Sequence, residues 1–260
     1  MIILIITVCI VISIVFSFLI YMLREARLNI ILTKDIDVKT LPKEFDGFSI
    51  YFISDVHRRR ISDDMLPQTL SPDIVIIGGD LTEEGVPFSR VRENVQKLRR
   101  FNVPILFVWG NHDLYVDRYS FEQILIDNGV KLLNNSVYTY KKAGLFLNLI
   151  GVCDSTNELD RLDEALEETL PGTRVLISHN PNIVEKIKVE DHIPLVISGH
   201  THGGQIRVFG WGIREKAGVW TKPFGTLIIS AGYGTTSYPL RLGAPPDALF
   251  IRLHPSDIQH

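Results

Sequence analysis

The first 23 residues form a long apolar run. Met1–Leu23 contains no charged side chain, and at about 1.5 Å per residue a helix of this length extends roughly 34 Å, enough to cross a bilayer. Arg24, Arg27 and Lys34 follow the run, and no basic residue precedes it. Because positive charge favours the cytoplasmic side, we predict a single-pass anchor in the cell membrane with the rest of the chain in the cytoplasm. The alternative is a cleaved export signal, which would place a basic residue before a shorter apolar core.

Beyond this run, short apolar segments alternate with segments of helical spacing. The predicted strands are rich in β-branched and aromatic residues and occupy 48–54, 73–80, 103–109, 173–177 and 195–197, with two or three more within 130–150. Helical patterns cover 87–100, 121–128 and 159–169. Strands joined by helices pair in parallel through right-handed crossovers, so their carboxyl ends meet at one rim. The pattern therefore predicts an α/β fold with its chemistry at that rim.

Length and charge limit the possible organisation. We predict an anchor over 1–23, a connector over 24–46 and one compact domain over 47–260, because about 215 residues suit a single domain. The net charge of -3 gives no sign of binding to a nucleic-acid polymer. The two cysteines are Cys9, in the apolar run, and Cys153, in the domain, so a disulfide framework is excluded. The sequence leaves the oligomeric state open.

Each strand of the rim is followed by residues that can bind a metal. The motifs are Asp55-Val56-His57, Gly78-Gly79-Asp80, Gly110-Asn111-His112-Asp113, Ser178-His179-Asn180-Pro181 and Gly199-His200-Thr201-His202. In an extended backbone, residues i and i+2 point the same way, so Asp55 and His57 could hold one ion. This triplet alone is weak evidence, because a turn with a solvated histidine would have the same sequence.

Taken together, the strand ends supply imidazole, carboxylate and amide groups. The candidate ligands are Asp55, His57, Asp80, Asn111, His179, His200 and His202. They are too many for one ion but suit two ions that share a carboxylate. A ligand set without thiolate suits Mn, Fe or Zn rather than Ca, and spacing does not choose among the three. The alternative, that these groups only cap strands and turns, fits each motif alone but not the ordered set.

The ordered motifs resemble the calcineurin-like metallophosphoesterase family. The resemblance covers Phe48 to about Leu253, and the longer strings at 178–181, 199–205 and 239–243 are similar to a bacterial membrane-associated branch. It implies a metallophosphoesterase-type β-sandwich of two mixed sheets flanked by helices. Some members of that branch act on lipid-linked or nucleotide-linked phosphates. A phosphorylated substrate of this kind is therefore the expected partner, beside the membrane itself.

The resemblance also implies roles for the site residues. Asp55, His57, Asp80 and His202 would hold one ion, and Asp80, Asn111, His179 and His200 the other, with Asp80 bridging the two. His112 would stabilise the transition state or protonate the leaving oxygen, and Asp113 could orient it. Two cations about 3.5 to 4 Å apart lower the pKa of a bridging water and align an in-line attack on phosphorus. The expected activity is hydrolysis of a phosphoester or pyrophosphate bond by a metal-bridging hydroxide.

The sequence leaves two interpretations open for several arginines, and two for the function of the whole protein. Arg58, Arg59 and Arg60 could contact substrate phosphates or anionic headgroups, or could form a solvated basic turn. Arg241 could reach the substrate or only fix a turn. The alternative to an enzyme is a membrane-anchored metal-binding scaffold that recruits a protein partner, but scaffolds of this fold usually have eroded ligands, whereas here the whole set is present. The sequence does not separate monoesters, diesters and pyrophosphates.

Overall fold

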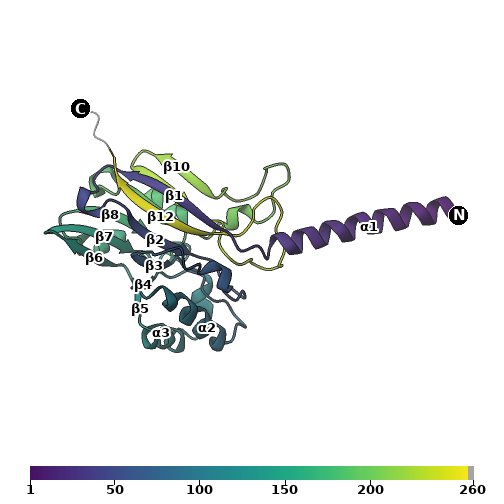
Figure 1. The fold of residues 1–260 in the computed structure, drawn as a ribbon, viewed down its shortest axis with the longest axis horizontal. Coiled ribbons are helices and arrows are strands. Elements are labelled where there is room, and N and C mark those ends of the chain that lie inside the picture. Colours follow the sequence, from purple (N-terminus) through teal and green to yellow (C-terminus); the bar gives the residue numbers. More distant parts are fainter. Residues whose placement is uncertain (257–260) are drawn as a thin grey trace.

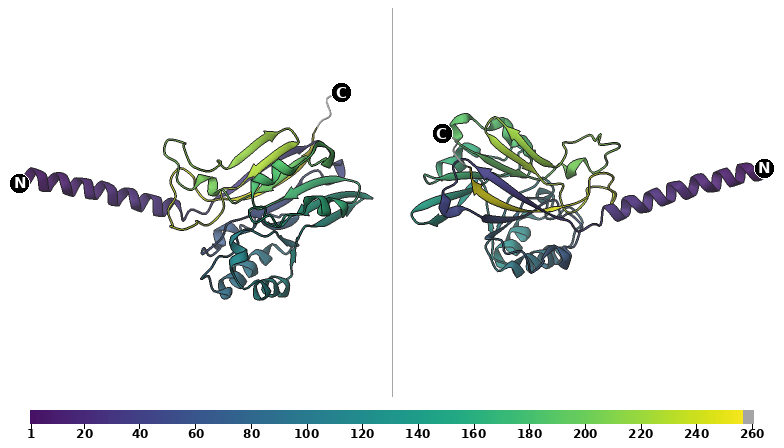
Figure 2. Two further views of the ribbon diagram at one scale, coloured as in Figure 1. Left: turned by 180° about the vertical axis from the view of Figure 1, so that it is seen from behind. Right: turned by 45° about the horizontal axis from the view of Figure 1, so that its top comes forward.

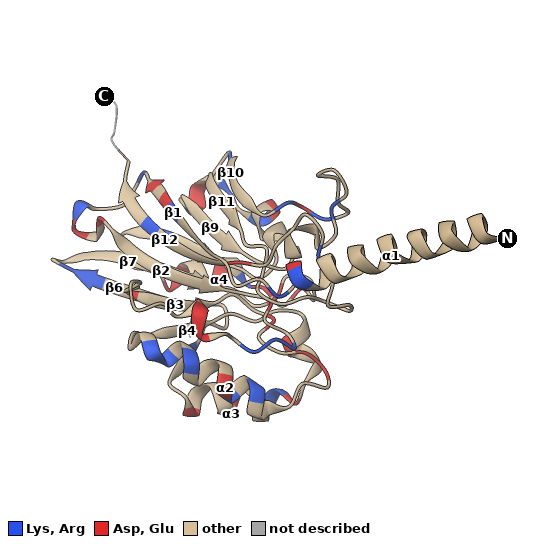
Figure 3. Ribbon diagram, turned by 45° about the vertical axis from the view of Figure 1, so that its right-hand side comes forward, with Lys and Arg blue, Asp and Glu red and all other residues tan. Residues whose placement is uncertain are grey.

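A computed structural model describes residues 1–256 and shows an apolar helix that projects from an α/β domain (Figure 1). The helix, α1 (Ile2–Glu25), is long and apolar enough to cross a membrane. Charged residues appear on it only in the last turn, beside the domain (Figure 3). The last four residues of the predicted domain, 257–260, lie outside the described residues.

Within residues 1–256 the domain consists of two six-stranded mixed sheets packed face to face (Figure 2). In spatial order the first sheet contains β1 (Ile31–Val38), β12 (Ala248–Pro255), β2 (Phe48–Ile53), β3 (Ile74–Ile77), β4 (Ile105–Phe107) and β5 (Val130–Leu132). The second contains β10 (Gly218–Lys222), β11 (Gly225–Ile229), β9 (Leu195–Ser198), β8 (Thr173–Ile177), β7 (Leu145–Gly151) and β6 (Ser136–Lys142). The flanking helices are α2 (Phe88–Leu98), α3 (Arg118–Asp127) and α4 (Leu162–Glu167).

The packing follows the two-residue alternation of side chains along each strand. In β2, Ile50 and Phe52 point between the sheets, whereas Tyr51 and Ile53 pack beneath α2 and α3. Leu162 of α4 packs in the cluster on the outer face of the second sheet. The central strands are therefore covered on both faces, which explains their continuous apolar sequences.

The fold class matches the prediction, and the elements differ mainly at their ends. The neighbours β2, β3, β4 and β5 pair in parallel, as do β7, β8 and β9. Their carboxyl ends therefore lie at one rim, as the alternation of strands and helices predicts. The strands β1, β10, β11 and β12 were not predicted.

The predicted connector over 24–46 is wrong in its central part. Residues 31–38 form β1, which pairs in parallel with β12 from the other end of the chain. Ile36 and Val38 are buried between the two sheets. The domain therefore includes residues ahead of the predicted boundary at 47.

The carboxyl end of α1 packs directly on the domain. The Oε1 atom of Glu25, which is buried, accepts a hydrogen bond from the amide of Ala244 at 3.1 Å. The carbonyl of Met22 accepts one from the amide of Arg241 at 3.2 Å. The helix α1 is thus joined to the segment 241–244 by hydrogen bonds as well as through its own chain.

Candidate metal centre

The strands that precede the predicted ligands end at the rim from which α1 leaves the domain (Figure 1). The structure brings six of these ligands into two groups, in each of which the ligand atoms lie within 4.8 Å of one another: Asp55, His57 and His202 in the first, and Asp80, His179 and His200 in the second. Each group combines residues that follow different strands. The fold therefore assembles side chains that are up to 147 residues apart, from Asp55 to His202, into one cluster.

Asp80, a member of the second group, also faces the first. Its Oδ2 atom is 3.2 Å from Nε2 of His179 and 3.7 Å from Nε2 of His57. Its other oxygen, Oδ1, accepts a hydrogen bond from the amide of His112 at 2.8 Å. One carboxylate oxygen thus faces an imidazole of each group, which is the position that a shared ligand would take.

In each group, two imidazole rings turn nitrogen atoms toward each other. The Nε2 atoms of His57 and His202 are 3.2 Å apart, and Nε2 of His179 is 3.1 Å from Nδ1 of His200. Two lone pairs cannot face each other at this distance without a proton or another cation between or beside them. Ligand nitrogens that share a metal ion also lie on the order of 3 Å apart. The arrangement fits two cation sites.

The pKa values of His179 and His200 also indicate that this pair favours one positive charge. Burial is the strongest single influence and lowers the pKa of His179, but the charge and hydrogen bond of Asp80, together with the charge of Asp55 and the carbonyl of Gly78, raise it to about 10. Burial and the neighbouring His179 lower the pKa of His200 to about 4. One ring of the pair therefore carries a proton at neutral pH, in a place where a divalent cation could bind instead.

Asn111 adds an oxygen that lacks a partner. Among the described residues its buried Oδ1 atom has no hydrogen-bond partner. Leaving a buried acceptor unsatisfied costs roughly 1 to 3 kcal/mol. A metal ion would satisfy this oxygen, and a donor set of imidazole, carboxylate and amide without thiolate fits Mn, Fe or Zn.

Groups outside the ligand set fix the imidazole rings. Nδ1 of His179 lies 2.9 Å from the carbonyl of Gly78, and Nδ1 of His57 lies 3.0 Å from Oε2 of Glu83. Such contacts hold the ring so that Nε2 faces the ion. Glu83 was not predicted, although its place three residues after Asp80 was a signal that could have found it.

The ligands occupy an unusual backbone conformation. The residues with positive φ include Asp55 (53°), His57 (50°), Asp80 (51°), His200 (67°) and His202 (51°). Each such residue costs roughly 1 to 3 kcal/mol, and such strain gathers at functional sites. Asp55 and His57 do approach each other, but the predicted reason is wrong, because β2 ends at Ile53 and the two residues are not in an extended strand.

A glycine allows the backbone of Asp80 to approach the second group. Gly79 has a φ of 87°, and a Cβ atom at this position would lie 2.6 Å from Nδ1 of His179. A side chain there would push the imidazole away from Asp80. The second glycine of the Gly-Gly-Asp motif is thus required by both its conformation and its space.

His112 and Asp113 have different surroundings. The ring of His112 is half-buried and contacts the ring of His57 edge-on, with centroids 4.9 Å apart. The buried carboxylate of Asp113 accepts hydrogen bonds from the amides of Asp80 (2.7 Å), Gly110 (3.0 Å) and Thr82 (3.0 Å). Asp113 therefore holds the loops that carry the ligands, which corrects the expectation that it orients the His112 ring.

The three arginines after the first motif have three different partners. Arg58 pairs with Glu83, and its side chain is 70% exposed. Arg60 pairs with an acidic residue of α2 at 3.0 Å. Arg59 donates to the carbonyls of residues 27–28 at 2.8 and 2.7 Å and so binds the chain just after α1. Of the three, Arg58 keeps an exposed guanidinium beside the metal centre.

Arg241 is a structural residue and not a substrate ligand. It is fully buried, and its guanidinium donates hydrogen bonds to five backbone carbonyls: those of His202 (3.1 Å), Ala231 (2.7 Å), Gly232 (3.0 Å), Gly234 (2.7 Å) and Ala244 (2.7 Å). No part of the side chain is left for a substrate. Of the two roles considered from the sequence, the structure supports the fixing of loops.

A cavity of about 400 Å³ lies beside the metal centre at the exit of α1. Its lining combines the chain after α1 with the rim, and includes Ala26, Arg27, Arg58, Glu83 and Ser237. Because Glu83 contacts His57, a molecule in this cavity would lie next to the first ligand group. The cavity is therefore the candidate substrate site.

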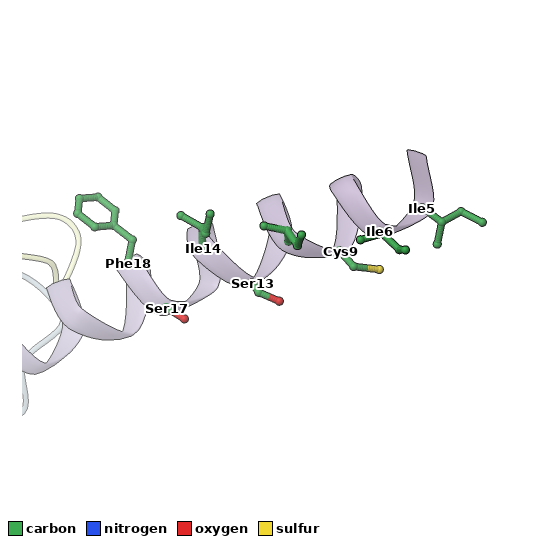
Figure 4. Close-up of a pocket in the computed structure, with 8 residues that line it drawn as sticks. Ile5, Ile6, Cys9, Ser13, Ile14, Ser17 and Phe18 are labelled. Atoms are coloured by element: carbon green, nitrogen blue, oxygen red, sulfur yellow. The ribbon is translucent and has the colours of Figure 1, made fainter. Parts of the chain in front are cut away.

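A second hollow lies along α1 itself (Figure 4). Cys9, Ser13 and Ser17 follow one another every four residues on one side of the helix, among larger apolar residues such as Ile14 and Phe18. This face contains no acid, base or metal-binding cluster. It belongs to the apolar helix and not to the catalytic site.

The residues of this metal centre lie in a segment that matches a known protein family. The family model for calcineurin-like phosphoesterases matches residues 48–204, more than half of the chain. The chain belongs to the calcineurin-like phosphoesterase family. It is therefore a metal-dependent phosphoesterase, and its substrate is a phosphorylated compound.

Individual relatives agree with this membership. An uncharacterized protein of Bacillus subtilis, YpbG, is 42% identical over 208 residues, which are 79% of this chain and 80% of the relative. An uncharacterized metallophosphoesterase of Helicobacter pylori is 28% identical over 90% of this chain and 61% of its own length. A Danio rerio protein described as a transmembrane protein with metallophosphoesterase domain is 29% identical over 66% of this chain and 44% of its own length. The chain thus spans less than two thirds of the latter two.

A solved structure has the same fold. The phosphopantetheinyl hydrolase of Mycobacterium tuberculosis superposes with a TM-score of 0.52 over 83% of this chain and 99% of its own. The two sequences are only 14% identical, so the likeness concerns the fold alone.

Proposed function

We propose that this protein is a membrane-anchored dinuclear metallohydrolase that cleaves a phosphoester or pyrophosphate bond in a lipid-linked or nucleotide-linked substrate at the bilayer surface. The position of Asp80 carries the proposal, because its Oδ2 atom faces His179 at 3.2 Å and His57 at 3.7 Å. This geometry supports two cation sites that share one carboxylate.

The seven predicted ligands would hold two divalent ions, Mn, Fe or Zn. Asp55, His57 and His202 would serve the first, Asn111, His179 and His200 the second, and Asp80 both. When bound, such a pair of ions lowers the pKa of water and holds the phosphoryl oxygens for in-line attack. Glu83 and the carbonyl of Gly78 would keep the rings of His57 and His179 turned toward the ions.

His112 would act on the departing oxygen. Its half-buried ring lies against His57, so one edge faces the metal centre while solvent and substrate still reach the ring. A positioned acid of this kind contributes about 10²- to 10⁴-fold to the rate. Arg58, with an exposed guanidinium beside Glu83, would bind a further phosphate of the substrate.

The cavity supports a substrate at the membrane surface. It is lined on one side by Ala26 and Arg27, the first residues after α1, and on the other by Arg58 and Glu83. If α1 crosses the bilayer, a lipid-linked phosphate would enter this cavity without leaving the headgroup layer. The basic residues that follow the apolar run would place the domain on the cytoplasmic side.

The full chain, reconstituted in lipid nanodiscs and stripped of metal, tests the proposal. Mn, Fe or Zn is restored, and hydrolysis is measured on an aryl phosphomonoester, an aryl phosphodiester and a lipid-linked pyrophosphate. We expect Asp80→Asn to lose both activity and bound metal. His112→Ala should keep its metal and lose about 10²- to 10⁴-fold in kcat.

An exposed histidine remote from the ligands provides the control, and His192→Ala should match the parent. The dinuclear mechanism is wrong if Asp80→Asn keeps the parent's activity and metal content. The role of His112 is wrong if its alanine variant turns over as fast as the parent.

A further inference from the structure

The loop between β9 and β10 exposes three large apolar side chains. The exposed fractions are 99% for Phe209, 84% for Trp211 and 103% for Ile213. In Figure 1 this green loop projects on the side of the domain where α1 ends, and both views of Figure 2 keep it there. A cluster of such residues on a surface marks a binding site more often than chance exposure.

The loop is an ordered hairpin. The amide of Val208 donates to the carbonyl of Trp211 and the amide of Trp211 to that of Val208, both at 2.9 Å. Phe209 (φ 50°) and Gly210 (φ 83°) form the tight turn at its tip. Arg207 donates to the carbonyl of Gly210 at 2.7 Å. A bulky residue is thus held in a strained conformation that presents it to the exterior.

The hairpin is fixed to the same segment as the anchor. The amide of Arg207 donates to the carbonyl of Leu242 at 2.7 Å, and the amide of Leu242 donates to the carbonyl of Gln205 at 3.0 Å. The neighbouring amide, that of Arg241, donates to the carbonyl of Met22 in α1. Adjacent residues therefore hold the hairpin and the helix, so the two have a fixed relation to each other.

We propose that residues 206–213, the apolar hairpin, insert their tip into the interfacial layer of the bilayer that α1 crosses. The inference rests on the proposed membrane anchor. Aromatic residues favour the interfacial layer, and the hairpin presents a Phe and a Trp at the end of the domain where α1 leaves it. The charged residues next to the tip are Arg207, Arg214, Glu215 and Lys216, a net positive set that suits anionic headgroups.

The second attachment would orient the metal centre. At the base of the hairpin, Arg214 donates to the carbonyl of His200 at 3.2 Å, so the hairpin touches a ligand loop directly. With a single attachment, the helix and the domain joined to it could tilt together relative to the bilayer. Insertion of the hairpin would limit that tilt and hold the rim, with its cavity, against the headgroups.

Fluorescence quenching in the full chain tests the hairpin without reference to activity. The protein is reconstituted in vesicles of phosphatidylcholine with a minor share of an anionic lipid, with and without bromine atoms on the acyl chains. Trp211 should be strongly quenched by brominated lipid, so Trp211→Phe should remove most of the quenching seen in the parent. Trp109 is buried in the core, and Trp220 lies on β10, so Trp220→Phe should leave that quenching in place.

Flotation of the vesicles separates failure of the hairpin from failure of the anchor. If the chain floats with the vesicles but Trp211→Phe leaves the quenching unchanged, the hairpin proposal is overturned and the anchor stands. If a second copy or a protein partner covered Trp211, brominated lipid would not quench it, and Trp211→Phe would again leave the quenching unchanged. If the chain does not float, the anchor is overturned and the hairpin proposal falls with it.

Discussion

Polar groups at the two ends of the parallel strands have opposite surroundings. At the amino ends, the carboxylate of Asp73 accepts hydrogen bonds from the amide and hydroxyl of Ser49 at 2.7 and 2.8 Å, and nearby ion pairs such as Asp35 with Arg252 are exposed. At the carboxyl ends, Asp55 and Asp80 are buried beside imidazoles whose nitrogen atoms face one another.

The difference shows that the fold accommodates destabilising features, namely buried charge and strained backbone, at the carboxyl ends of the strands. The amino ends satisfy their polar groups with the protein or with solvent, and so contribute to stability alone. The carboxyl ends combine buried charge with left-handed backbone at the ligands, and the apolar clusters between the sheets and on their outer faces hold this arrangement in place. Substitutions at the two ends should therefore have different consequences.

The largest expected effect is at Arg241. Arg241→Met removes the donor of five backbone carbonyls at the metal rim and should lower the free energy of unfolding by several kcal/mol, because each buried carbonyl left without a donor costs roughly 1 to 3 kcal/mol. Denaturant unfolding measures this loss. The matched control is Arg252→Met at the other end, where the exposed pair with Asp35 is screened by solvent and contributes little to stability. Equal losses for the two variants would contradict the comparison.

An intermediate effect is expected at Glu83. Glu83→Gln keeps the shape of the side chain but removes the negative charge beside Nδ1 of His57. Loss of such an outer contact typically costs 10- to 100-fold in metal affinity. Titration of the metal-stripped protein with Mn measures it, with Glu93→Gln, the exposed partner of Arg60, as the control. Unchanged affinity in Glu83→Gln would show that the contact does not support the ligand.

The smallest effect is expected at His254, at the amino end. Its hydrogen bond to Asp46 and its contact with Asp35 raise its pKa. The stabilisation is therefore complete below the ordinary pKa of about 6.5 and disappears as the pH rises through the higher folded value.

His254→Gln should lower Tm slightly at pH 5.5, by an amount that corresponds to about 0.5 kcal/mol or less for an exposed pair. It should lower Tm less at pH 9 and leave hydrolysis unchanged. A loss that is the same at both pH values, or a fall in activity, would place His254 in a different role from the one its surroundings indicate.

The sequence indicates where the candidate ligands gather, because each of them follows an apolar strand. Strands such as β2 and β3 are recognisable from local composition, and parallel pairing then brings their ends together. β1 cannot be predicted in this way, because its outward residues are polar and its pairing partner β12 lies about 200 residues further along the chain. No local pattern specifies that pair.

Roles that depend on tertiary contacts also escape prediction. The residue type and the position of Arg241 near the end of the chain suggest an exposed cation, yet the fold buries it among backbone carbonyls. Asp113 follows His112 directly, but its carboxylate points to the amides of Asp80 and Thr82. The side-chain directions of both residues follow from loop conformations that the neighbouring sequence does not specify.

Anomalous X-ray diffraction from crystals of the full chain loaded with Mn would test the shared carboxylate most directly. The geometry predicts two anomalous peaks roughly 3.5 to 4 Å apart, both within coordinating distance of Asp80, one beside His57 and the other beside His179. A single peak, or a pair of peaks from which Asp80 is remote, would contradict it.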